Sequence, residues 1–115
     1  MQESILTSIK KLLGITEDYT HFDADIIMHI NTVFMILMQL GVGPAEGFRI
    51  SDASAVWGDF LTTPDQLEAV KSYVYLRVKM LFDPPTIGSV VQSTENLISE
   101  LSFRLNVEVD PGKMS

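Results

Sequence analysis

Apolar side chains recur at helical spacing over most of the chain, and this pattern predicts an all-α fold. Four segments have apolar residues three and four positions apart, which places them on one face of a helix. These segments span residues of about 4–13, 22–40, 64–82 and 86–105. Gly14 and Gly41 follow the first two segments, where glycine commonly ends a helix. We therefore expect one domain over residues 1–115, a small bundle of three long helices with a short N-terminal helix.

Two segments lack the helical period. Residues 41–62 contain four of the seven glycines, which predicts a long loop with a short helical turn near residues 54–60. Residues 106–115 predict an extended C-terminal tail, because apolar and polar residues alternate at its start. At the start of the second helix, Thr20 and Asp23 have the spacing of a capping box.

Two of the long helices carry apolar residues on more than one side. In the helix over 64–82, a rotation of about 100° per residue gives one stripe for the domain's own core and a second stripe on the far side. The second stripe contains Ala69, Tyr73, Leu76 and Met80. In the helix over 22–40, Met28, Met35 and Ile36 stand among polar residues, away from a wide apolar face.

Two interpretations of these additional apolar residues stay open. Both helices can be central in the bundle and buried on all sides, or the additional residues can contact another subunit. A bundle of only three long helices cannot easily bury two of them on all sides. Self-association would cover the additional apolar residues. We therefore expect subunit contacts through Met28, Met35, Tyr73, Leu76 and Met80.

Composition also indicates a protein that associates with other chains. With 46% hydrophobic residues, a chain of 115 residues has more apolar surface than so small a domain usually buries. Its 15 acidic and 8 basic residues give a net charge of −7, which disfavours tight binding to a phosphate backbone. The apolar run over 26–40 is interrupted by polar side chains and is short for a bilayer span, so we expect a soluble protein without membrane partners.

No pattern of reactive side chains predicts an enzyme. Cysteine is absent, which excludes a thiol nucleophile, a disulfide and a thiolate metal site. His21, Asp25 and His29 are four residues apart and would share one face of a continuous helix, but His21 falls before or at the expected helix start. The glycine-rich stretch GVGPAEG lacks the lysine of a phosphate-binding loop. We therefore expect no catalytic residue, no bound metal and no cofactor.

The aromatic residues of the long loop are candidates for binding a partner. Trp57 permits two interpretations: it fastens the loop to the bundle, which we favour, or it presents an exposed contact. Phe48 and Phe60 lie on either side of it in the same loop. If the loop binds a neighbouring protein, we expect these three rings to make the contact.

Several separate blocks of the sequence resemble one known family. The blocks are HFDADIIMHIN, QLGVGPAEGF, WGDFL, LEAVKSYVYLRVKMLFDPP and FRLNVEVDP. In this order, and over nearly the whole chain, they resemble the head-tail connector (adaptor) proteins of tailed bacteriophages and prophages of Gram-positive bacteria. None of the blocks encodes chemistry.

The resemblance implies a structural protein of the virion neck, present in the host cytoplasm during assembly. All-helical subunits of this family assemble as a ring, usually dodecameric, under the portal vertex of the filled head. The ring extends the DNA channel, through which DNA passes without sequence-specific binding, and docks the next neck, stopper or tail-completion protein. The resemblance implies no enzymatic activity.

The C-terminal tail is a candidate for docking. Val107 and Val109 alternate with Glu108, an arrangement suited to adding a strand to an exposed edge of another protein. We expect these residues to dock onto the portal protein or an adjacent subunit as an extended strand, and a ring would repeat the contact in every copy. A disordered tail stays open as the alternative.

Two other classes of protein share parts of this pattern. A small helical DNA-binding regulator needs clustered cations on a recognition helix, whereas Lys71, Arg77 and Lys79 are spread around theirs. A small helical adaptor or antitoxin-like dimer would also have a second apolar face, so this class stays open. The mass of the protein in solution, alone and with a portal protein, separates a dimer from a ring.

Overall fold

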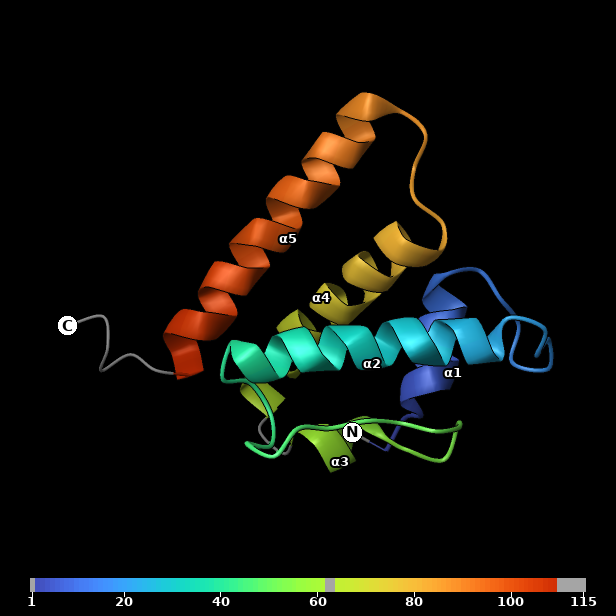
Figure 1. Ribbon diagram of the computed structural model, residues 1–115, viewed down its shortest axis with the longest axis horizontal. Helices are drawn as coiled ribbons and strands as arrows, with labels where there is room; N and C mark the ends of the chain where they lie inside the picture. Colours follow the sequence, from blue (N-terminus) through green and yellow to red (C-terminus); the bar gives the residue numbers. More distant parts are fainter. Residues whose placement is uncertain (1, 62–63, 110–115) are drawn as a thin grey trace.

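The computed structural model describes residues 2–61 and 64–109, over which the chain forms helices joined by irregular segments (Figure 1). The helices are α1 (Ile5–Leu12), α2 (Asp23–Gln39), α3 (Trp57–Phe60), α4 (Pro64–Phe82) and α5 (Gly88–Val109). Within the described residues, extended pairing is limited to one antiparallel bridge between Ser4 and Val56. The prediction of an all-α fold is confirmed.

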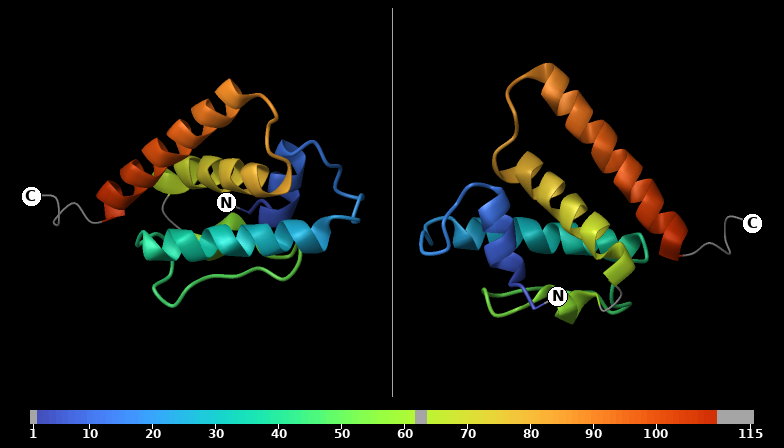
Figure 2. Two further views of the ribbon diagram at one scale, coloured as in Figure 1. Left: turned by 45° about the horizontal axis from the view of Figure 1, so that its top comes forward. Right: turned by 180° about the vertical axis from the view of Figure 1, so that it is seen from behind.

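Helix α4 is the central element, with α2 on one side and α5 on the other (Figures 1 and 2). Helix α1 packs against both α2 and α4. The loop that follows α2 runs back along that helix and leads to the short helix α3 (Figure 2). This arrangement leaves α2 and α5 as the two outer helices of the bundle.

The core lies where α1, α2 and α4 meet. Helix α2 contributes one face whose side chains are at most 1% exposed, made of Ile26, Ile30, Val33, Phe34 and Leu37. Helix α4 contributes the fully buried Val70, Tyr73, Val74 and Val78, and α1 contributes Ile5 and Ile9. The spacing of three and four residues explains why these segments are helical, because each helix is stabilised mainly by the apolar face that it buries.

Helices α1 and α2 end in the same way, at the glycines that the sequence placed there. Gly14 has a φ of 83° and Gly41 a φ of 84°. After Gly41, the backbone N–H of Val42 donates to the carbonyl of Leu37 at 2.9 Å, and the equivalent bond follows Gly14. This Schellman pairing satisfies carbonyls that a helix end leaves open, and it directs the buried Val42 into the core.

The capping box predicted from Thr20 and Asp23 is not formed, because α2 begins without a side-chain cap. The Asp23 carboxylate instead lies 2.8 Å from the ammonium of Lys10, whose side chain is 2% exposed. The same ammonium donates to the backbone carbonyls of Glu17 at 3.0 Å and Tyr19 at 2.8 Å. Lys10 thus has three acceptors for its three protons and holds the segment between α1 and α2 in place.

The second apolar stripe of α4 belongs largely to the subunit's own core. Tyr73 is fully buried, and its hydroxyl accepts a hydrogen bond from Nε of Arg77 at 3.0 Å. Leu76 and Met80 are half-buried and pack against the core. A helix that lies between α2 and α5 needs apolar residues on two sides. Tyr73 is therefore not accessible for the predicted subunit contact, whereas a contact through the half-buried Leu76 and Met80 stays a prediction.

Helix α5 continues to Val109, further than the sequence indicated. The segment of Val107, Glu108 and Val109 is therefore helical, and the prediction of an extended strand there is wrong. The preference of two alternating valines for a strand is weaker than the gain from continuing the backbone hydrogen bonds of the helix. The buried Leu105, one turn earlier, anchors this end of the helix. Residues 110–115 of the predicted tail lie outside the described residues.

Aromatic residues fasten the loop between α2 and α4 to the bundle. Trp57 is fully buried, and its Nε1 donates to the hydroxyl of Ser8 at 2.8 Å. Phe60 is also buried, with its ring centroid 4.6 Å from that of Phe34. Trp57 and Phe60 are therefore core residues. For Trp57 this agrees with the favoured interpretation, that it fastens the loop to the bundle, and neither ring is exposed for the alternative contact with a partner. Phe48 is half-buried and also packs against Phe34.

A glycine at position 43 permits this close packing of the loop. Gly43 has a φ of +86°, a conformation that side-chain-bearing residues rarely adopt. A Cβ atom there would lie 2.7 Å from Cζ of Phe60, which is closer than two such carbon atoms can approach. At this position the glycine gives the loop a fixed path over the Phe60 ring.

Candidate interaction surface

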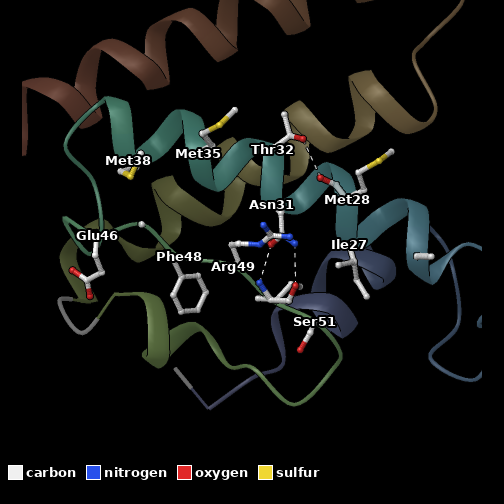
Figure 3. A pocket seen from close by; sticks show the side chains of 13 residues that line it. Ile27, Met28, Asn31, Thr32, Met35, Met38, Glu46, Phe48, Arg49 and Ser51 are labelled. Atoms are coloured by element: carbon white, nitrogen blue, oxygen red, sulfur yellow. Dashed lines mark hydrogen bonds between the residues drawn. The ribbon is translucent and has the colours of Figure 1, made fainter.

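The outward side of α2 exposes three methionines. Met28 is 57%, Met35 52% and Met38 36% exposed, and the three lie along one side of the helix (Figure 3). We call these residues the methionine face. Flexible thioether side chains adapt to many partner shapes, and methionine is therefore frequent at binding surfaces.

The loop after α2 forms a second wall opposite the methionine face. Residues 46–51 run alongside the helix and enclose, together with it, an open groove of about 760 Å³ (Figure 3). The half-buried Phe48 lines this groove from the loop side. We call this space the α2 groove. Phe48 is thus the loop aromatic that remains accessible to a partner, whereas the other two lie in the core.

Asn31 sets the width of the α2 groove. Its Nδ2 donates to the carbonyl of Ile50 at 2.9 Å, and its Oδ1 accepts from the N–H of Ile50 at 2.8 Å (Figure 3). Ile50 itself is buried, so the loop is held both by this pair of bonds and by apolar packing. A groove held in this way is formed before any partner arrives, which lowers the entropy cost of binding.

One arginine of the groove has no carboxylate partner within residues 2–61 and 64–109. Arg49 is exposed and lies beside Asn31 (Figure 3). The structure gives Arg77 and Arg104, the other arginines, a tyrosine and a glutamate partner respectively. In a chain with a net charge of −7, a free guanidinium beside an apolar groove favours a partner that combines apolar and acidic side chains.

The first half of α5 forms a second exposed apolar surface. Ile87, immediately before the helix, is 62% exposed, and Val90 and Leu97 are each 44% exposed. We call these three residues the α5 edge. The helix is anchored further along the chain, where Ile98 and Leu105 are buried. Phe103 is also exposed, but it points to a different side of α5.

The residues predicted for subunit contacts have divergent environments. Met28 and Met35 are exposed on the methionine face, as a contact requires. Leu76 is half-buried, and Met80 lines a smaller pocket of about 460 Å³ to which Ile36 and Ile98 also contribute. The side chains of residues 107–109 lie outside the described residues.

Sequence reasoning missed part of the interaction surface. The exposed Met38 extends the methionine face beyond the predicted residues, and none of the three residues of the α5 edge was predicted to contact a partner. A signal for the edge was present, since Val90 and Leu97 are seven residues apart, the period of a helix seam. No sequence signal indicated that Arg49 would lie at a groove.

The histidines do not form a metal site. His21 precedes α2, and its ring packs at 4.8 Å from that of Phe22, whereas His29 lies 6.5 Å from the ring of Phe82. Over residues 2–61 and 64–109, no group of three or more His, Cys, Asp or Glu residues is arranged to hold a metal ion. In the same residues, no helix is long and apolar enough to cross a membrane.

The fold and these surfaces define a small helical protein whose accessible features suit contact with other proteins. The sequence profile of a family described as phage connector protein matches residues 5–112. The chain therefore belongs to the phage connector protein family, which makes it a structural head-tail connector protein and a component of the virion. Comparisons with curated proteins and with solved structures find no match.

Proposed function

We propose that this chain assembles with further copies of itself into a ring in the neck of a tailed phage. The ring lies under the portal protein, continues the DNA channel and docks the next stopper or tail-completion protein. It forms on the virion in the cytoplasm of the host cell. The chain binds no cofactor and catalyses no reaction in this role.

The exposed methionine face carries this proposal. Met28 and Met35 are each more than half exposed and lie side by side on one face of α2, and contiguous exposed apolar surface of this kind marks contacts between proteins. Because α4 satisfies its second stripe within the chain, the contact residues lie on the outer helices instead. The acidic balance of the chain also suits a channel through which DNA must slide.

Met35→Asp is expected to abolish assembly and leave the subunit folded. A carboxylate buried without a partner in a subunit interface costs several kcal/mol, but the same carboxylate is solvated on the free subunit, where Met35 is 52% exposed. Light scattering of the purified protein, alone and with portal protein, measures the assembly. Met35→Leu is the matched control and is expected to assemble like the wild type. If Met35→Asp forms assemblies of the same mass as the wild type, the methionine face does not take part in the ring contacts.

Truncation after Asn106 is expected to weaken binding to the portal protein. We propose that the C-terminal end of the chain, beginning with Val107 and Glu108, docks there without the extended geometry first expected. The truncated chain keeps Leu105 in the core and the bond from Asn106 Nδ2 to the carbonyl of Leu40 at 3.2 Å, so its stability is expected to stay near that of the full chain.

Binding of the full and truncated chains to immobilised portal rings tests this docking. A ring multiplies a weak contact, so the loss is expected to be larger for assembled connectors than for single subunits. Equal binding by the two chains would show that the portal protein binds the helical body of the subunit instead.

A further inference from the structure

The first half of α5 packs only loosely against the rest of the described residues. None of the residues from 88 to 97 is buried, although this stretch is regular helix. Isolated helices of this length are marginal in water and usually depend on packing of an apolar face. The exposed Ile87, Val90 and Leu97 of the α5 edge supply such a face with nothing against it.

The α5 edge and the methionine face have matching periods. Met28 and Met35 are seven residues apart, and so are Val90 and Leu97, which corresponds to about 10 Å along each helix. Helices with apolar residues at this spacing pack together by inserting one side chain into a hole formed by four others. On α2, such a hole is formed by Met28, Asn31, Thr32 and Met35, all of which line the α2 groove.

The charges around the two surfaces are also complementary. Glu100 lies one turn after Leu97 and on the same side of α5, with its side chain 56% exposed. Among the described residues, Glu100 pairs with the exposed Arg104 on its own helix. A Leu97 side chain seated in the hole on α2 would bring Glu100 of its copy toward Arg49, which lies beside Asn31 and has no carboxylate partner among the described residues (Figure 3).

We propose that the α5 edge of one copy of this chain occupies the α2 groove of the next copy. The two surfaces lie on different helices, α2 and α5, which both pack against α4. Each copy therefore offers one surface to the neighbour before it and the other to the neighbour after it. Such a heterologous contact generates a closed ring or an open filament rather than a two-fold dimer. The inference rests on the proposed ring and names the surfaces that form it.

The absence of native cysteine allows a direct test with introduced thiols. The variant Met35→Cys/Leu97→Cys is concentrated and oxidised with diamide, and its products are separated on a non-reducing gel. A disulfide forms only where the two Cα atoms approach within about 7 Å. Because each copy carries both halves of the contact, we expect a ladder of dimers, trimers and larger species that collapses on reduction.

Matched variants define the geometry. Met35→Cys/Gln92→Cys places the second thiol at an exposed position about 140° around α5 and is expected to give no ladder. Each single cysteine variant can give dimers at most. A ladder of equal yield from the Gln92 variant, or efficient dimers from Met35→Cys alone, would overturn the proposed pairing, the latter by showing contact between two α2 helices.

The wild-type chain separates failure of this inference from failure of the proposed function. Its mass with portal protein is measured beside the oxidised double variant. A wild-type ring without a ladder in the double variant would overturn the pairing of the two surfaces and leave the ring intact. A wild-type chain that stays monomeric with portal protein, together with no ladder, would overturn both.

Discussion

Trp57→Ala is expected to destabilise the subunit by roughly 3–5 kcal/mol, the usual cost of emptying a buried aromatic site. The ring is fully buried, lies 5.9 Å below the ammonium of Lys71 and donates its N–H to Ser8. Its removal leaves a cavity between the N-terminal segment, α1 and the loop. Because small domains are stable by only about 5–15 kcal/mol, we expect the melting temperature to fall by more than about 10 °C.

Urea unfolding followed by far-ultraviolet circular dichroism measures the effect, since Trp57 is the sole tryptophan and its fluorescence is lost with it. Trp57→Phe is the matched control. It keeps an aromatic ring in the site but removes the hydrogen bond to Ser8, so its loss is expected to be clearly smaller than that of the alanine variant. An alanine variant as stable as the wild type would show that the loop is held by other contacts, such as those of Asn31 with Ile50.

Lys10→Met is expected to destabilise the subunit by roughly 3 kcal/mol, the lower end of the range for breaking a buried ion pair. Methionine has a similar length but provides no protons, so the carbonyls of Glu17 and Tyr19 and the carboxylate of Asp23 lose their shared donor. The lower end applies because Asp23 is 26% exposed and regains some water. Amide exchange in the segment between α1 and α2 is expected to accelerate as well.

Lys11→Met provides the control for the change in charge. Lys11 is the next residue along α1, but it is exposed, so its substitution is expected to change the free energy of unfolding by no more than about 0.5 kcal/mol. Both variants are compared by urea unfolding at the same pH and salt concentration. If the two lysine variants prove equally stable, the ammonium of Lys10 does not hold the segment as the geometry indicates.

The two stability variants and the interface variants report on separate parts of the molecule. Trp57 and Lys10 lie in the interior, and neither lines the α2 groove. Met35 and Leu97 are exposed, so the free subunit tolerates polar replacements there. Loss of assembly without loss of stability is therefore the pattern that identifies a contact between subunits.

Sequence alone predicts the helical class, the central parts of the long helices and the glycines that end the first two. These features depend on local physics: the period of the apolar residues and the positive φ that glycine readily adopts. The buried face of α2 follows from the same pattern, because its residues are spaced to one side of the helix. The exposure of Met28 and Met35 was also predictable from the sequence, because each lies among polar residues on its side of the helix.

Which element covers each apolar stripe depends on the tertiary fold. The sequence has two stripes on α4, and Tyr73 of the second stripe is buried in the core, but no local pattern states where a later helix will lie. The burial of Trp57 and of Lys10 also depends on residues beyond the local pattern. The hydrogen-bond partner of Trp57 is 49 residues away. The two carbonyls that Lys10 contacts are 7 and 9 residues away. The α2 groove, with Arg49 beside it, likewise depends on a distant loop, which Asn31 and the buried Ile50 hold against the helix.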